Sequence, residues 1–415
     1  MMAPSDWTPT TTGDLIGDGK LEVGDGYRAK NAEFGPTGIP FLRIRNLDDG
    51  HLVLDEADLF PEEHLARVGP KISQPGDCVI APKATIGRMA YLDEAAPRVL
   101  YSPQVSYWRV LDRAALDSRF IGCWLRGKEF ETQAFQTESS TSMADYINLR
   151  DQRQMRVTMP PLDVQRKIAA VLAAYDELIE NNLRRIEILE ETAQVVYREW
   201  FVNFRFPGHE AVALVDSPLG PIPDGWDKST VGEAAENFDR LRKPLSKMQR
   251  AEMQGAYPYY GAAKVFDYVN DYIFDGEYLL VAEDGSVVTL DGHPVLQLAS
   301  GKFWANNHTH ILRGSAVSTH HLYLALSRVQ IMGYVTGAAQ PKITQGALNR
   351  VPLLVPPPPT RDQFDQLIRP MFGLRQNLLV QNENLRSTRD LLLPRLVSGE
   401  IDLSELEIET DWLAS

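Results

Sequence analysis

Two long amphipathic helices are the feature that most limits how this chain can fold. Between residues 162 and 206 no glycine or proline interrupts the sequence, and apolar residues recur every three or four positions. A second apolar ladder covers residues 364–392. The first run predicts a helix of roughly 40 residues, about 60 Å long at 1.5 Å per residue, which is several times the usual globular length. Such a helix with one apolar stripe needs a partner helix, and the second ladder supplies one.

Proline-rich segments lead into both ladders and mark where the helices begin. Pro370 is expected to kink or split the second helix, and Pro394 to end it, because proline lacks a backbone donor and clashes with the preceding turn. The residues predicted to pack the helices together or to bind partners are Tyr175, Ile179, Asn182, Ile186, Leu189, Trp200, Phe364, Leu367, Met371, Leu374, Leu378 and Leu385.

The segments outside the helices also repeat in the same order. A tryptophan is followed six residues later by glycine and an acid, a Gly-acid pair opens an apolar run, and an isoleucine stands thirteen residues before the prolines. The matching pairs are Trp7 with Trp226, Gly76-Asp77 with Gly276-Glu277, and Ile147 with Ile343. Several matches in one order indicate an internal duplication.

The duplication predicts an α+β fold. We expect two mixed α/β domains separated by two long helices that pack against each other, with a pseudo-twofold internal duplication. The predicted segments are a first domain at 1–158, a helix at 159–206, a second domain at 207–356, a helix at 357–400 and an acidic tail at 401–415.

Composition limits the class of protein further. The net charge of −14, from 42 basic and 56 acidic residues, argues against a protein that coats nucleic acid non-specifically. Cys78 and Cys123 are too few for a disulfide framework or a four-cysteine zinc site, so we expect buried apolar thiols. No signal peptide is visible and no apolar run approaches the length of a membrane span. These features predict a cytoplasmic protein.

The search for catalytic motifs returns little. There is no phosphate loop ending in Gly-Lys-Ser/Thr and no paired-glycine dinucleotide fingerprint. The sequence MPPL at 159–162 lacks the polar and aromatic residues of the amino-methyltransferase tetrapeptide, and Asp18-Gly19-Lys20 has nuclease-like spacing without partner carboxylates. His308 and His310 would share one strand face, but no third metal ligand is marked. Structural, hydrogen-bonded histidines are therefore favoured over a metal site.

Basic and polar side chains offer binding chemistry instead, since arginine and lysine fix phosphates or read guanine edges. Residues 39–46 are expected to form a half-buried strand with Arg43 and Arg45 on one face. A further strand is expected at 278–282 and a helix at 120–135. A basic cluster falls within the eleven positions 240–250 and comprises Arg240, Arg242, Lys243, Lys247 and Arg250. The tyrosines at 257–260 offer rings for base stacking, although core and turn positions are favoured for them. The candidate DNA-contacting residues are Arg43, Arg45, Asn46, Lys83, Arg88, Ser140, Thr141, Arg240, Arg242, Lys243, Lys247, Gln340 and Lys342.

Several segments resemble the specificity subunits of type I restriction–modification systems. The resemblance covers nearly the whole chain and is strongest at the helices and the segments leading into them. The similar stretches are MPPLDVQRKI at 159–168, the helix end YREWF at 197–201, NNHTHI at 306–311, AQPKI at 339–343 and LLLPRLVSGEI at 391–401.

The resemblance implies a subunit without catalysis of its own. Each domain would be a target-recognition domain that reads one half of a bipartite site in double-stranded DNA. The two helices would pack as an antiparallel coiled coil and hold the domains a fixed distance apart. The partners implied are two methyltransferase (modification) subunits and restriction/translocase subunits. No cofactor is implied for this chain, whereas S-adenosylmethionine, ATP and Mg belong to the partner subunits. The alternative is a degenerate coiled-coil scaffold that no longer directs methylation; a stand-alone nuclease or methyltransferase lacks its motifs.

Overall fold

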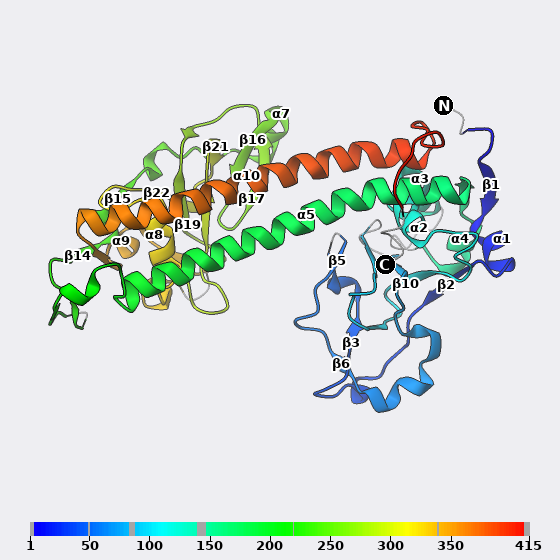
Figure 1. Ribbon diagram of the computed structural model, residues 1–415, viewed down its shortest axis with the longest axis horizontal. Coiled ribbons are helices and arrows are strands. Elements are labelled where there is room, and N and C mark those ends of the chain that lie inside the picture. Colours follow the sequence, from blue (N-terminus) through cyan, green and yellow to red (C-terminus); the bar gives the residue numbers. More distant parts are fainter. Residues whose placement is uncertain are drawn as a thin grey trace. The chain divides into compact units, whose positions relative to one another are not determined.

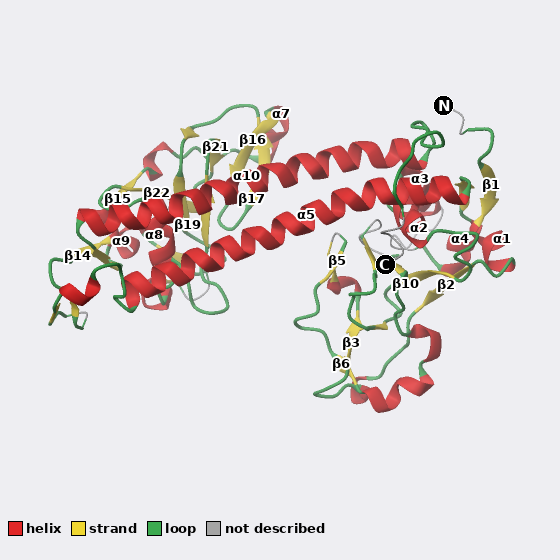
Figure 2. Cartoon of the chain, in the orientation of Figure 1, coloured by secondary structure: helices red, strands yellow, loops and turns green. Residues whose placement is uncertain are grey.

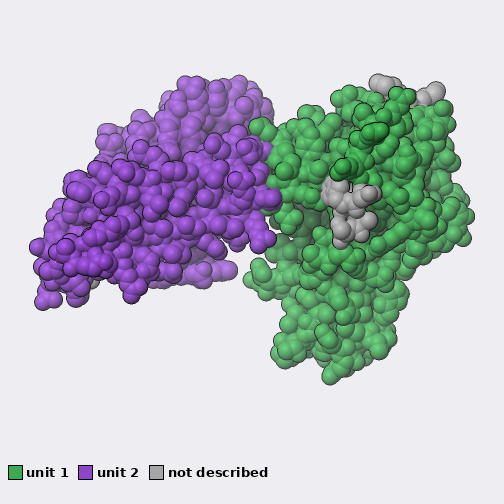
Figure 3. All heavy atoms as spheres, viewed as in Figure 1, with its two compact units in different colours: residues 1–180, 382–415 green, residues 181–381 purple. Residues whose placement is uncertain are grey.

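The computed structural model describes residues 4–48, 50–82, 88–138, 147–218, 220–337 and 340–410. The chain divides into two compact units, which Figure 3 distinguishes by colour. Unit 1 comprises residues 1–180 and 382–415, and unit 2 comprises residues 181–381. Each unit contains part of both long helices, α5 (Leu162–Tyr197) and α10 (Pro358–Val397) (Figure 1).

The two long helices confirm the main sequence prediction. Helix α5 has 36 residues and is followed by a π-helical turn at Arg198–Val202, while α10 has 40 residues. The expectation that Pro370 would kink or split α10 was wrong as regards a split, and Pro394 does not end the helix, because α10 runs unbroken to Val397. A proline inside a helix costs about 3 kcal/mol, but Phe364, Ile368 and Phe372 on the same helix are buried. Each such side chain stabilises the packed helix by roughly 1.5–3 kcal/mol, which outweighs one proline.

Unit 1 is organised around a four-stranded antiparallel sheet (Figure 2). Its order is β2 (Leu21–Asp25), β10 (Ser106–Val110), β7 (Cys78–Ile80) and β8 (Met89–Tyr91). Helix α2 (Ser118–Leu125) packs against β7 and β8. A smaller sheet has the order β6 (Leu59–Phe60), β3 (Ile39–Leu42) and β9 (Leu100–Tyr101), with β3 and β9 parallel. Strand β1 (Thr8–Thr11) pairs with β11 (Arg156–Met159), which leads into α5.

Unit 2 repeats this topology with its own elements. The four-stranded antiparallel sheet has the order β15 (Ala235–Asn237), β22 (Thr309–Gly314), β19 (Tyr278–Ala282) and β20 (Leu296–Ala299), and α8 (Thr319–Leu326) packs on β19 and β22. The second sheet has the order β17 (Val265–Val269), β16 (Gln254–Tyr260), β21 (Lys302–Ala305) and β18 (Phe274–Asp275), with β16 and β21 parallel. Strand β14 (Asp227–Thr230) pairs with β25 (Pro352–Val355), which precedes α10.

Shorter elements complete the units. In unit 1 these are α1 (Thr12–Gly17), β4 (Leu47–Asp48), β5 (His51–Leu52), α3 (Lys128–Glu138) and α4 (Leu149–Gln154). In unit 2 they are β12 (Leu214–Val215), β13 (Ile222–Pro223), α6 (Val231–Ala234), α7 (Lys247–Glu252), β23 (Val335–Thr336), β24 (Lys342–Ile343) and α9 (Gln345–Asn349). Among the described residues, no helix is both long and apolar enough to cross a membrane.

The central strands place alternate side chains in different cores, as strand geometry requires. In β7, Cys78 and Ile80 join the core that contains Leu172 of α5, whereas Val79 joins a separate core on the other face. The expectation of buried, free thiols is confirmed, and burial raises the pKa of Cys123 to about 12. In unit 2 the helix ends contribute aromatic rings to the main core.

Within each unit, contacts between α5 and α10 show that the helices run in opposite directions. In unit 1, Arg389 Nη1 lies 2.6 Å from Asp176 Oδ1, and the Asn382 amide donates to the Ile179 carbonyl at 3.3 Å. In unit 2, Arg375 pairs with Glu190, and the ring of Phe364 packs against those of Tyr197 and Phe201.

The predicted helix-packing residues fall into three groups. Ile179, Asn182, Ile186, Phe364 and Leu378 are buried; Tyr175, Leu189, Trp200, Met371 and Leu385 are half-buried; and Leu367 and Leu374 are 41% and 40% exposed. The buried face of α10 instead passes through Ile368, Phe372 and Asn382. Two polar residues, Arg375 and Asn382, also lie on this face. They interrupt the apolar spacing from which the buried face of the helix was predicted. Leu367 and Leu374 stay candidates for binding a partner.

Two local predictions in unit 1 were wrong. Residues 39–46 are not one strand, because β3 ends at Leu42 and a 3-10 turn occupies Ile44–Asn46, so Arg43 and Arg45 do not share a strand face. The Asn46 side chain closes this turn by accepting from the Arg43 amide at 3.0 Å and donating to the Val53 carbonyl at 2.8 Å. The helix expected at 120–135 is divided into α2 and α3.

Candidate nucleic-acid interface

In unit 2, two of the predicted DNA-contacting cations converge on one carboxylate. Arg242 follows the 3-10 turn Asp239–Leu241, and Lys342 begins β24. Arg242 Nη1 donates to Glu283 Oε2 at 2.5 Å and to the Thr309 carbonyl at 2.7 Å. Lys342 Nζ lies 3.0 Å from Glu283 Oε1. Glu283 follows β19 directly, so this carboxylate links two candidate segments to the central sheet.

Beneath these cations lies a buried histidine. The side chain of His310, in β22, is 1% exposed. Its Nδ1 lies 2.5 Å from Asp239 Oδ2, and its Nε2 lies 2.8 Å from the Ile343 carbonyl. Both neighbours are acceptors, and only the protonated ring carries a donor on each nitrogen. The contacts therefore match an imidazolium.

The electrostatics of the pair agree with this assignment. Burial alone lowers the pKa of His310, but the hydrogen bond and charge of Asp239, with the Ile343 carbonyl and Glu283, raise it above its usual value. For Asp239 the direction is reversed: burial raises the pKa, and the hydrogen bond and charge of His310 bring it below its usual value. Each partner stabilises the charged form of the other.

Three residues of this group could in principle hold a cation. Ligand atoms of Asp239, Glu283 and His310 lie within 4.8 Å of one another. Arg242 and Lys342 already pair with these carboxylates, and with His310 protonated there are three cationic groups for two carboxylates. This donor set does not fit a metal ion, and we assign it as an ion-pair network.

The histidines at 308 and 310 are hydrogen-bonded, as the sequence favoured. His308 is half exposed and its Nδ1 lies 2.6 Å from Asp284 Oδ1, whereas His310 is buried. The acidic partners of His310, Asp239 and Glu283, were not among the predicted site residues. Asp239 directly precedes the basic cluster and Glu283 directly follows a predicted strand, but nothing local in the sequence joins them to His310.

The other cations of the basic cluster are arranged differently. Arg240, Lys243 and Lys247 are exposed, and none makes an ion pair with any described residue. The Lys243 carbonyl accepts from the Trp304 indole at 2.6 Å, which fixes the backbone at that point. Arg250 is buried instead, and its Nε lies 2.9 Å from Asp267 Oδ2. Gln340 is exposed beside Lys342 in the chain.

In unit 1 the described candidates differ in exposure. Arg43 is half-buried, pairs with Asp58, and its guanidinium lies 4.9 Å from the centre of the Phe41 ring. Asn46 is buried in the turn that it closes. Arg45 and Arg88 are exposed, and Arg88 donates to the Leu47 carbonyl at 3.4 Å. Lys83, Ser140 and Thr141 lie outside the described residues.

The two units use the same backbone bond beside their candidate segments. In unit 2 the Ile343 amide donates to the Glu283 carbonyl at 2.9 Å, and in unit 1 the Ile147 amide donates to the Pro82 carbonyl at 2.9 Å. The bond in unit 1 joins the residue before Lys83 to the segment that follows Ser140 and Thr141. The sequence pair Ile147 and Ile343 therefore has one structural role in both units.

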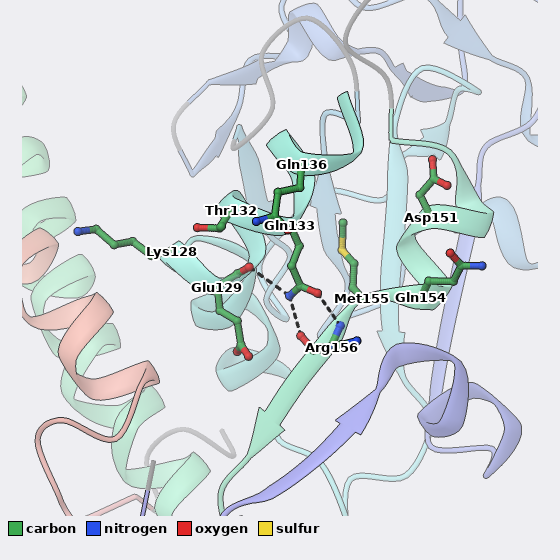
Figure 4. A pocket seen from close by; sticks show the side chains of 9 residues that line it. All are labelled: Lys128, Glu129, Thr132, Gln133, Gln136, Asp151, Gln154, Met155 and Arg156. Carbon is green, nitrogen blue, oxygen red and sulfur yellow. Dashed lines mark hydrogen bonds between the residues drawn. The ribbon is translucent and has the colours of Figure 1, made fainter. Parts of the chain in front are cut away.

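Unit 1 also has an open hollow, between α3, α4 and the start of β11 (Figure 4). Its organising side chain is Gln133, whose amide donates to the Arg156 carbonyl at 2.8 Å and accepts from the Arg156 amide at 2.7 Å. None of the predicted DNA-contacting residues lines it. The lining residues are Lys128, Glu129, Thr132, Gln133, Gln136, Asp151, Gln154, Met155 and Arg156. These offer hydrogen bonds and charges, without histidine or cysteine.

Comparison with known proteins identifies the family. The model of the type I restriction modification DNA specificity domain matches residues 4–191 and again residues 223–368. The chain belongs to this family. Its sequence is 23% identical over 426 residues to the specificity subunit of the type I restriction enzyme MjaIX from Methanocaldococcus jannaschii, covering 97% of this chain and 95% of that protein.

Two further similarities agree with this family. A putative type I restriction enzyme specificity subunit from Haemophilus influenzae is 34% identical over 143 residues, or 34% of this chain and 36% of that one. The crystal structure of the type I restriction–modification S subunit from M. genitalium has a TM-score of 0.56 at 14% identity, covering 95% of this chain and 99% of that chain. This type I specificity subunit thus has the fold of a solved S subunit, and the family that the sequence resembles is confirmed.

Proposed function

We propose that this specificity subunit reads a bipartite DNA site, with one recognition domain for each half-site. The observation that carries the proposal is the double match to the DNA specificity domain in a chain whose two units repeat one sheet topology. Two similar recognition domains match the two halves of a DNA site, in the same way that the twofold symmetry of a dimeric repressor matches a palindromic operator. The recognition domains are residues 1–158 and 207–356, with helical regions at 159–206 and 357–400 and a tail at 401–415.

The helices act as a spacer in this proposal. They pack as an antiparallel coiled coil, and pseudo-twofold symmetry relates the halves of the chain. The 36 residues of α5 give a length of about 54 Å at 1.5 Å per residue. At roughly 3.4 Å per base pair this length corresponds to about 16 base pairs of B-DNA. The helix length then sets the unread gap between the half-sites.

The candidate cations divide into two roles. Exposed side chains contact phosphates or base edges, and they are Arg45, Arg88, Arg240, Lys243, Lys247 and Gln340. Arg242 and Lys342 position the backbone beside them through Glu283, as Arg43 and Asn46 do in unit 1. Lys83, Ser140 and Thr141 belong to the proposed contact surface of the first domain.

The outer faces of the helices provide docking positions for partners. Several apolar side chains on α5 and α10 are exposed, which marks interaction surfaces when they are contiguous. They are Leu178, Leu183, Ile188, Val195, Leu367, Leu374, Val380 and Leu391. We assign these faces to two methyltransferase subunits, which restriction/translocase subunits join. The chain itself is non-catalytic and carries no cofactor; S-adenosylmethionine, ATP and Mg act on the partners.

Methylation mapping tests the proposal. The chain is expressed in cells together with the methyltransferase encoded beside it, and modified adenines are located across the genome. The expected result is one two-part motif with a constant gap, which is absent when the methyltransferase is expressed alone. A stable complex that methylates nothing would replace this function with that of a scaffold.

A further inference from the structure

We propose that His310 and Asp239 form a proton-dependent lock that positions the DNA-facing segments of unit 2. The inference rests on the proposed function and adds a regulation to it. The lock consists of His310, Asp239, Glu283, Arg242 and Lys342. Its central ring, His310, is buried, whereas the candidate contacts Arg240, Lys243, Lys247 and Gln340 are exposed.

Three separate segments meet at the His310 ring. His310 Nδ1 lies 2.5 Å from Asp239 Oδ2, and Asp239 Oδ1 also accepts a hydrogen bond from the Ile311 amide at 2.8 Å. These two contacts fix the turn that carries Arg240 to β22. His310 Nε2 lies 2.8 Å from the carbonyl oxygen of Ile343, the residue that follows Lys342 in the chain. The ring therefore holds the 240–247 segment and the 340–342 segment on the same strand.

Both hydrogen bonds require the protonated ring. A neutral imidazole has one donor, so loss of the proton leaves either the Asp239 carboxylate or the Ile343 carbonyl without one. Leaving a buried acceptor without its partner is unfavourable, most of all for a carboxylate. Deprotonation also removes one of three positive charges facing two carboxylates, so less positive charge remains beside the phosphate-binding surface.

The groups that face His310 set the direction of the pH dependence. These are Asp239 and Arg242 from the turn, Glu283 after β19, and Lys342 in β24, with the pair His308–Asp284 beside them. Their balance raises the pKa of His310 above its ordinary 6.5. A raised folded-state pKa means that the lock is fully formed below pH 6.5 and is lost as the pH rises through the folded-state pKa.

The test uses the full chain in complex with its methyltransferase, after the motif has been mapped. The probes are the intact motif duplex and two duplexes in which one or the other half-site is scrambled, and affinity is measured between pH 6 and 9. For the wild type, discrimination at one half-site falls about tenfold across this range, the factor expected for one charge-assisted hydrogen bond, and discrimination at the other half-site stays constant.

Variants separate a proton-dependent lock from a merely structural histidine. His310→Gln removes the pH dependence and leaves discrimination at that half-site at its high-pH level. Asp239→Asn lowers the pH midpoint, because the neutral amide no longer raises the pKa of His310; a purely structural role would not move the midpoint. The matched control is His293→Gln, whose ring contacts the Val329 carbonyl, which is not part of the lock, and whose profile should stay that of the wild type.

The outcomes also distinguish this inference from the proposed function. A wild type that binds both half-sites with pH-independent discrimination overturns the lock and leaves the function intact. A complex that does not prefer the intact motif at any pH overturns the proposed function itself. If His310→Gln fails to fold, the test rests on the pH midpoint of half-site discrimination in Asp239→Asn. A midpoint equal to that of the wild type rejects the lock.

Discussion

At the scale of single residues, buried ion pairs hold the loops and strands of the recognition domains in place. In unit 1, Asp77 is fully buried directly before β7, and both of its oxygens accept from Arg109 of β10 at 2.7 Å. The Tyr101 hydroxyl donates to the same carboxylate at 2.7 Å. Arg109 also donates to the carbonyl of Ile72, so one guanidinium joins the central sheet to the loop before it.

Removing one partner of this pair should destabilise unit 1 strongly. Arg109→Ala leaves a buried carboxylate unpaired, and breaking such a pair costs about 3–5 kcal/mol. Urea unfolding of the full chain should show this loss as an earlier transition. Arg113→Ala is the control, since exposed Arg113 donates, among the described residues, to the Pro75 carbonyl alone. Equal transitions for wild type and Arg109→Ala would contradict this role.

Residue roles were the part of the site that sequence could not predict. Arg240 and Arg242 stand two positions apart, yet one is exposed and the other binds a carboxylate 41 residues away. Burial and long-range pairing make that difference, and neither leaves a local signal. The sequence did place the candidate segments correctly beside strands, and it predicted β19 at 278–282 to the residue.

At the scale of elements, the long helices were predictable because their length and apolar period are local properties of the chain. The face that they bury was less predictable. In α10 the ladder was read through Leu367 and Leu374, whereas the structure buries Ile368, Phe372 and Asn382. The buried face contains polar residues, which ion pairs and side-chain amide hydrogen bonds accommodate. A pattern based on hydrophobicity alone therefore does not identify this face.

Replacing Pro370 should stabilise the second helix. Pro370 is exposed inside α10, where a proline costs about 3 kcal/mol relative to alanine. Pro370→Ala should therefore raise the melting temperature of the full chain. Gly373→Ala is a matched variant on the same helix, with open space at its Cβ position and an expected gain of about 0.5–1 kcal/mol. A fall in melting temperature for Pro370→Ala would show that the helix needs the proline's geometry.

At the scale of the whole molecule, an internal duplication accounts for the two similar units. Both central sheets have one strand order, and Ile147 and Ile343 make the same backbone bond in their units. The repeat was predictable because its markers, a tryptophan, a Gly-acid turn and an isoleucine, occupy structurally required positions. The division of the helices between two compact units was not predictable, since it depends on contacts distant in sequence.

Lengthening the helices should lengthen the gap in the target. Four residues inserted after Asn182, with four more after Gln381 to keep α5 and α10 matched, add about 6 Å to each helix. The gap between methylated half-sites should then grow by about two base pairs. The control is a four-residue insertion in the exposed turn near Leu290, which leaves the helices unchanged. An unchanged gap after the helix insertion would reject the helices as a ruler.

The most direct test of one domain for each half-site is an exchange of one domain. Residues 207–356 are replaced by the corresponding segment of another family member, and the methylated motif of the hybrid is mapped beside that of the parent. One half of the motif should change to a new sequence, while the other half is retained. A hybrid that assembles with the methyltransferase and changes both halves, or neither, would contradict the assignment of one domain to each half-site.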